Sequence, residues 1–72
     1  MKVKSKITGK IYEPELARFI PNMKQNQRYL FSGKAYDSLL DIICGNEDKL
    51  VFVWEINEVM DELYDSWCKR EL

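Results

Sequence analysis

The most apolar run of the chain, residues 50–54, is followed within a few residues by an amphipathic segment from Asn57 to Arg70. A strand over this run would be apolar on both faces, because its odd-numbered and even-numbered residues are all apolar. Such a strand is typical of the centre of a sheet that is covered on both sides. The pattern therefore predicts a buried strand that leads into a C-terminal helix, with most of the core formed on or against this pair.

The amphipathic segment fits an α-helix with one apolar and one acidic face. At the helical angle per residue, its large apolar residues fall within an arc of about 140° and are expected to face the core; they are Ile56, Val59, Met60, Leu63, Tyr64 and Trp67. The opposite arc carries four carboxylates, Glu58, Asp61, Glu62 and Asp65. Two like-charged i,i+4 pairs on this arc each cost the helix roughly 0.2–0.5 kcal/mol, and only Asp65–Lys69 compensates.

Residues 35–44 fit two patterns. The helical spacing is carried by Tyr36, Leu39, Leu40 and Ile43, and the alternation of a strand by Leu40, Ile42 and Cys44. A turn-rich spacer of hairpin length, residues 45–49, separates this segment from the strand-like run. The spacer favours a β-hairpin that pairs residues 39–44 with residues 50–55.

The N-terminal residues predict another hairpin. Val3–Ile7 alternates apolar or small residues with lysines, Thr8-Gly9 supplies a turn, and Lys10–Glu13 returns. Gly9 suits this turn because tight hairpins require a positive φ. Pro14 ends the second strand, because proline cannot donate to a ladder.

Two registers of this hairpin are compatible with the sequence. A two-residue turn pairs Lys4 with Glu13 and Lys6 with Ile11. A three-residue loop pairs Ile7 with Ile11 and places both in the core. A slip of one residue exchanges the two faces of a strand, and we favour the second register because it joins the two apolar residues.

Residues 16–20 are expected to form a short third strand, or to continue the second strand after a kink at Pro14, and Pro21 closes this segment. A helix of about three turns follows, with Asn22 as N-cap and Gln25 in the position of a capping box. Its inner side is predicted to hold Met23, Gln27, Leu30 and Phe31, and its exposed side Lys24, Asn26 and Arg28. Gly33 is expected to end it in the left-handed conformation.

These elements predict one α+β domain over residues 1–72. A small antiparallel sheet consists of the N-terminal hairpin plus the second hairpin, with the short middle helix and the C-terminal amphipathic helix packed on it. If both helices cover one face, the two-sided apolar strand leaves the other face uncovered. A homodimer or a protein partner would then bury that face.

Composition narrows the class of protein. A chain of 72 residues that is 46% hydrophobic is one small domain with a real core and a thin margin of stability. It has no run of 18 apolar residues, so no membrane span is expected, and no apolar stretch follows the basic N-terminus to form a signal peptide. We therefore expect a cytoplasmic protein, in which Cys44 and Cys68 are reduced thiols that behave as small hydrophobic residues.

The formal charge of −1 hides an uneven distribution. Residues 1–34 carry a net charge of +6, and residues 35–72 carry −7. The fold would then either present one basic and one acidic surface or bring two oppositely charged halves together. We favour the second arrangement.

Residues that would carry catalysis are missing. The chain has no histidine, which excludes Ser-His-Asp and Cys-His nucleophilic sites and mixed Cys/His zinc sites. Two cysteines 24 residues apart do not form a CxxC pair. We expect no catalytic residues, no cofactor and no metal, and hence a protein that is not an enzyme.

Two binding hypotheses remain. The acidic arc, Glu58, Asp61, Glu62 and Asp65, would occupy a basic surface on another protein, and electrostatic complementarity would set the choice of partner. Alternatively, the basic first half would bind nucleic acid, because its cations are interleaved with aromatic residues; the candidates are Lys4, Lys6, Lys10, Arg18 and Arg28. The overall negative charge favours the protein partner.

Three short runs resemble small uncharacterised proteins of phages and prophages of Gram-positive bacteria. They are Lys4–Tyr12, Asp48–Val53 and Trp67–Leu72, and they cover under half of the chain. The resemblance implies a cytoplasmic accessory protein and carries over neither an activity nor site residues. Small phage proteins often bind and inhibit host factors, which agrees with the hypothesis of an acidic binding surface.

Overall fold

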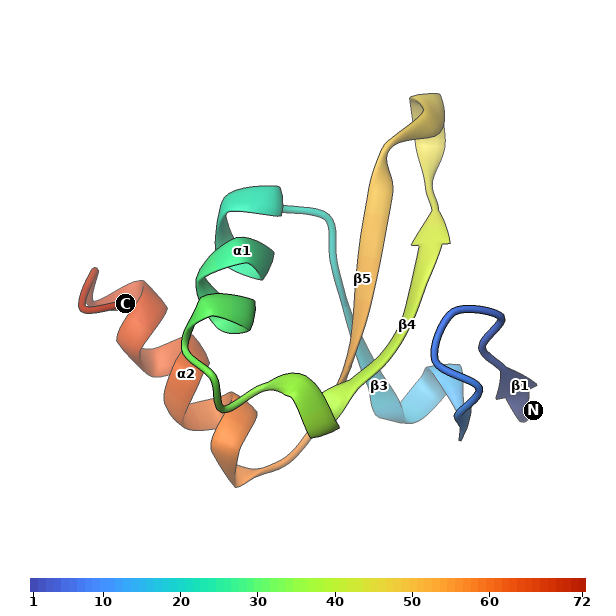
Figure 1. Cartoon of the computed structure of the whole chain (residues 1–72), viewed down its shortest axis with the longest axis horizontal. Coiled ribbons are helices and arrows are strands. Elements are labelled where there is room, and N and C mark those ends of the chain that lie inside the picture. The colour runs from blue at the N-terminus through green and yellow to red at the C-terminus, as the bar shows by residue number, and fades with distance from the viewer.

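The computed structural model describes all 72 residues and shows an α+β arrangement of two helices and two small antiparallel sheets (Figure 1). This confirms the predicted α+β class, but the N-terminal hairpin does not share one sheet with the second hairpin as predicted, because residues 17–20 pair with residues 52–55 in its place. The strands and helices, in chain order, are β1 (Val3–Lys4), β2 (Ile11–Tyr12), β3 (Ala17–Ile20), α1 (Met23–Phe31), β4 (Leu39–Cys44), β5 (Leu50–Glu55) and α2 (Glu58–Cys68). Three short 3₁₀ turns connect them, at Pro14–Leu16, Tyr36–Ser38 and Asn46–Asp48.

The larger sheet has β5 at its centre, in the order β3-β5-β4 with antiparallel neighbours. The predicted hairpin of residues 39–44 with 50–55 is confirmed, as is the central position of the apolar run. The register shifts between Leu39 and Asp41, which is typical of a β-bulge. This shift turns Asp41 to the same face as its partner Val53.

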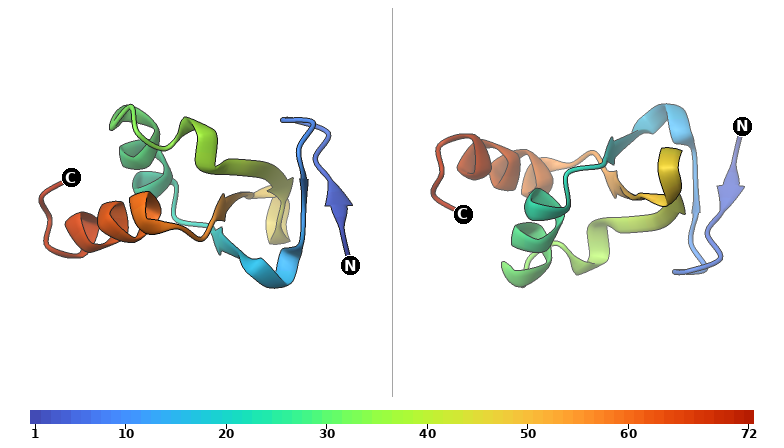
Figure 2. Two further views of the ribbon diagram at one scale, coloured as in Figure 1. Left: turned by 90° about the horizontal axis from the view of Figure 1, so that it is seen from below. Right: turned by 90° about the horizontal axis from the view of Figure 1, so that it is seen from above.

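Both helices lie on one side of this sheet (Figures 1 and 2). The core between them contains Tyr29 from α1, Phe52 and Trp54 from β5, and Met60 and Leu63 from α2. The ring of Tyr29 meets Trp54 edge to face at 5.5 Å between centroids. Aromatic pairs of this kind add about 0.5–1.5 kcal/mol beyond their buried area. The core therefore forms on β5 and α2, as the apolar pattern predicts, and α1 completes it.

The predicted inner side of α1 is wrong except at Leu30, which is half-buried against the core. The helix buries Gln25, Asn26 and Tyr29 against the core and leaves Met23 and Phe31 exposed, at 48% and 76%. The cause is a buried polar pair, since Asn26 accepts a hydrogen bond of 2.9 Å from the Trp54 indole N–H and donates one of 2.9 Å to the Ile20 carbonyl. A polar side chain that is satisfied in this way can be buried.

The ends of α1 agree with the sequence signals. The Asn22 side chain accepts hydrogen bonds from the backbone N–H groups of Lys24 and Gln25, so it is the N-cap. Gln25 does not complete a capping box, because its amide donates to the Tyr29 hydroxyl instead. Gly33 follows the helix with φ 75°, in the left-handed conformation expected there.

The N-terminal hairpin forms in neither predicted register. Val3 pairs with Tyr12 and Lys4 with Ile11, in a sheet of its own. As a result Ile7 and Ile11 are 64% and 65% exposed instead of lying in the core. The Ser5 hydroxyl causes this register, because it accepts hydrogen bonds from the N–H groups at positions 7 and 8 and so lengthens the turn.

Asp41 joins this hairpin to the larger sheet. Its carboxylate accepts hydrogen bonds of 2.6 Å from the Ser5 hydroxyl, 2.7 Å from the Tyr12 hydroxyl and 2.8 Å from the Ile42 N–H. Burial alone would raise the pKa of Asp41, but these hydrogen bonds outweigh burial and lower it. Burial, and then the contact with Asp41, raise the pKa of Tyr12 to about 12.

The hairpin lies across the sheet from the helices (Figure 2), on the face that was expected to be uncovered. Val53 is fully buried on that face, whereas Phe19, on the same face of β3, stays largely exposed. The second face is therefore covered in part by the chain itself. No helix of the structure has the length and apolar character needed to span a bilayer.

Candidate functional site

The acidic face of α2, which we define as Glu58, Asp61, Glu62 and Asp65, is exposed along its whole length. The helix that carries it is held firmly. Met60 and Leu63 are buried in the core, and the Asn57 side chain accepts a hydrogen bond of 2.9 Å from the Met60 N–H as N-cap. Asn57 also donates to the Ser38 hydroxyl at 3.0 Å, which ties the start of α2 to the turn before β4. The four carboxylates are thus displayed on a rigid element.

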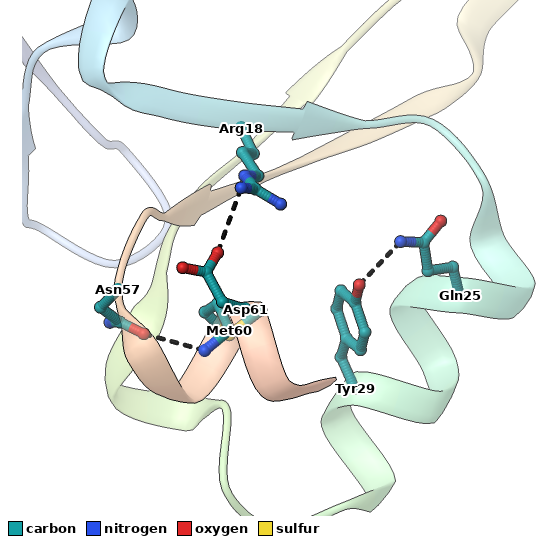
Figure 3. A network of polar contacts seen from close by, with 6 residues as sticks. All are labelled: Arg18, Gln25, Tyr29, Asn57, Met60 and Asp61. Atoms are coloured by element: carbon teal, nitrogen blue, oxygen red, sulfur yellow. Dashed lines mark hydrogen bonds and ion pairs between the residues drawn. The ribbon is translucent and has the colours of Figure 1, made fainter. Parts of the chain in front are cut away.

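Two of these carboxylates have cationic partners within the chain. Arg18 on β3 reaches across to Asp61 at 3.1 Å, and both side chains remain about half exposed (Figure 3). The guanidinium also lies 5.6 Å from the centre of the Tyr64 ring, within the range of a cation–π contact. Lys69 pairs with Asp65 at 3.0 Å, which confirms the predicted i,i+4 pair. Exposed pairs such as these contribute roughly 0–1 kcal/mol each.

Glu58 and Glu62 form no ion pair. They stand four residues apart on the same side of α2, where their like charges repel. Glu58 lies in the first helical turn, where the positive end of the helix dipole favours a negative charge. The dipole and the core contacts therefore hold in place a pair of carboxylates without counter-ions.

The apolar arc of α2 is wider than its contact with the core. Met60 and Leu63 are buried and Trp67 is half-buried, as predicted, but Ile56, Val59 and Tyr64 are exposed. The expectation that the whole arc faces the core is therefore wrong. The helix contacts the sheet and α1 only through a narrow strip of its surface. Exposed apolar side chains therefore lie between this strip and the acidic face.

A hollow of about 570 Å³ lies where β3, the start of α1 and α2 meet. Arg18, Gln25 and Tyr64 line it, and Gln25 donates a hydrogen bond of 2.7 Å to the buried Tyr29 hydroxyl (Figure 3). Burial raises the pKa of Tyr29, and a hydrogen bond with Cys68 raises that of Tyr64. Both phenols stay neutral at pH 7, and the hollow has no carboxylate or imidazole to act as a base.

The five basic residues of the alternative hypothesis lie apart from one another. Lys4, Lys6 and Lys10 are on the N-terminal hairpin, Arg18 is on β3, and Arg28 is on α1, across the sheet from the hairpin (Figure 2). Lys10 donates from its ammonium to the carbonyls of residues 37 and 39, at 2.8 and 3.0 Å. One ion pair, between Arg18 and Asp61, joins the basic and acidic halves of the chain.

Cys44 and Cys68 are free thiols, and both are exposed. The expectation of two free thiols agrees with this, but neither side chain is buried as a small hydrophobic residue usually is. Cys44 stands at the end of β4 and Cys68 at the end of α2. No three cysteine, aspartate or glutamate side chains are grouped closely enough to hold a metal ion.

Sequence reasoning did not find the two buried polar clusters, Asn26 with Trp54 and Asp41 with Ser5 and Tyr12. The position of Asp41, alone in the apolar run Leu39–Ile43, is the one signal that could have indicated the second cluster. Both clusters hold elements together and neither borders the acidic face of α2.

No protein-family model matches the chain, and searches of curated proteins and of solved structures give no significant match. The geometry of the chain therefore carries the functional argument by itself.

Proposed function

We propose that this chain is a non-enzymatic binding protein that recognises a basic surface on another protein through the acidic face of α2. The observation that carries the proposal is the pair Glu58 and Glu62, exposed on a helix anchored by the core and left without counter-ions. A complementary positive surface would relieve their repulsion and speed association. The half-exposed Val59 beside them would add apolar contact.

The chemistry of the surface supports binding over catalysis. The hollow beside α2 is lined by the neutral phenol of Tyr64 and by an arginine that is engaged with Asp61, and no carboxylate or imidazole lines it. The carboxylates of the acidic face are solvated and stand in no enclosed site. An accessory role in the cytoplasm, as the resemblance to small phage proteins implies, agrees with this reading.

The test is affinity capture with a charge-matched control. A Glu58→Gln/Glu62→Gln variant removes the two unpaired carboxylates, and a Glu13→Gln/Glu15→Gln variant makes the same change in net charge at a distance from α2. We expect proteins captured by the wild type and by the control to be lost with the α2 variant. Capture should also weaken between ~0.1 and ~1 M salt, because exposed charges are then screened.

Identical captures with all three proteins would contradict the proposal. Retention of the wild type on single-stranded DNA at ~0.15 M salt, lost in a Lys4→Ala/Lys6→Ala/Lys10→Ala variant, would favour the nucleic-acid hypothesis instead.

A further inference from the structure

An apolar stripe of α1 is only partly covered within the chain. Met23, Gln27, Leu30 and Phe31 follow one side of the helix and, with Lys24 and with Phe52 of β5, line a groove of about 390 Å³. A surface helix normally turns its apolar stripe to the core, but α1 buries Tyr29 and its polar neighbours there, and of the stripe only Leu30 packs against the core. Met23 and Phe31, which the sequence pattern assigns to the inside, therefore lie on the surface.

Beyond Phe52, the hairpin of β4 and β5 carries a further exposed apolar residue. This hairpin extends past both helices (Figure 1). Leu50 lies on the same face of β5 as Phe52, because it is two residues away, and it is about half exposed. Met23 and Phe31 on the groove and Leu50 on β5 are therefore exposed apolar residues. Exposed apolar surface that is rimmed by polar residues marks interaction sites.

Charges at the two ends of this surface are opposite. Arg28 and Lys34, at the C-terminal end of α1, form no ion pair, and α1 contains no acidic residue. The hairpin tip carries Glu47 and Asp48, of which only Glu47 has a partner, Lys49, at 3.8 Å. The tip lies beyond the N-terminal end of α1 and away from the C-terminal end of this helix (Figure 1).

We propose that this groove is the interface of a homodimer, in which the α1 stripes of two copies pack antiparallel about a two-fold axis. The antiparallel arrangement moves the acidic tip of each copy to the basic end of the other copy's α1. It thereby brings Asp48, which has no ion pair within the chain, to Arg28 and Lys34, and it covers the exposed Met23, Phe31 and Leu50. The surface complements itself, as a two-fold interface requires. The acidic face of α2 takes no part in this contact, so the proposal is independent of the proposed function.

The first test measures mass in solution by light scattering and sedimentation equilibrium. We expect a particle of twice the 8.6 kDa chain mass, and a monomer for Phe31→Glu, because a charge would be buried in the interface. Ile7→Glu is the matched control, since Ile7 is also an exposed apolar residue but lies on the N-terminal hairpin. It should remain a dimer. Circular dichroism confirms that each variant is folded.

The second test exchanges charges across the interface. Arg28→Glu/Lys34→Glu should raise the dimer dissociation constant at least tenfold. The fourfold variant that also carries Glu47→Lys/Asp48→Lys should return this constant to the wild-type value. A wild type that stays monomeric at ~1 mM, a Phe31→Glu variant that still dimerises, or an Ile7→Glu variant that does not would each overturn the proposal. Failure of the second charge change to restore the dimer would overturn the antiparallel pairing.

Discussion

Asp41 shows how one side chain decides the arrangement of a segment. It interrupts an apolar strand, and its carboxylate is nevertheless ionised because three donors surround it. The donors come from β4 itself and from residues 29 and 36 positions earlier in the chain. The local pattern of the N-terminal hairpin favoured a register that buries Ile7. The register that forms, with the turn lengthened by Ser5, brings the Ser5 and Tyr12 hydroxyls to this distant carboxylate instead.

The hydrogen bonds of Asp41 predict a loss of stability in acid. Its folded-state pKa lies below the ordinary value of 3.8, so its contribution is complete above that value. The contribution is lost as the pH falls through the folded-state pKa. Urea unfolding between pH 2 and pH 6 should show the wild type losing stability relative to Asp41→Asn as the solution becomes more acidic. Parallel curves for the two proteins would contradict the assignment.

Tyr12 predicts the opposite dependence in alkali. Its pKa rises to about 12 on folding, so its contribution is complete below the ordinary value of 10.0. The contribution disappears as the pH rises toward the folded-state value. Ultraviolet titration of the four tyrosines should show one late-ionising phenol fewer in Tyr12→Phe than in the wild type. The same substitution should cost about 1.5–3 kcal/mol at pH 7, because a charged acceptor loses a donor.

At the scale of elements, propensity and capping signals predicted where helices and strands begin and end. The hydrophobic pattern was less reliable in predicting which face of a helix is buried. The apolar run, the 39–44 hairpin strand, the Asn22 cap and Gly33 all follow from local chemistry. The inner face of α1 does not, because the Asn26–Trp54 hydrogen bond rotates the helix. That bond joins residues 28 apart, so no local pattern encodes it. The hydrophobic pattern also failed to predict how much of the apolar arc of α2 is buried, since this depends on how closely α1 packs against α2.

The capping of α2 gives a prediction at this scale. Asn57→Ala removes the acceptor for the Met60 N–H and the bond to Ser38, and should cost about 0.5–2 kcal/mol. Asn57→Ser keeps a capping oxygen and should lose less. The midpoints of thermal or urea unfolding measure both. Equal losses would show that the bond to Ser38, and not the cap, stabilises this end of the helix.

At the scale of the whole molecule, the sequence predicted an α+β domain with a central two-sided strand, and the structure agrees. It also led to the expectation of one uncovered sheet face. The N-terminal hairpin occupies part of that face, and the exposed apolar surface lies instead beside α1. The candidate acidic residues were identified correctly as exposed, because charge on one helical arc is a local property. Of their two cationic partners, Lys69 could be predicted because it stands four residues after Asp65. Arg18 could not, because it is distant in sequence from Asp61.

The hairpin of β1 and β2 is attached to the rest of the chain mainly by polar groups. The anchoring bonds run from Ser5, Tyr12, Thr8 and Lys10 to β4 and the turn before it, while Ile7 and Ile11 point to solvent. Few buried apolar contacts therefore resist its separation, and the domain is expected to contain two cooperative units of unequal stability. Amide hydrogen exchange should show residues 3–12 exchanging through a local opening that leaves β5 protected. Exchange of both segments at one common rate would instead show that the chain opens as a single unit.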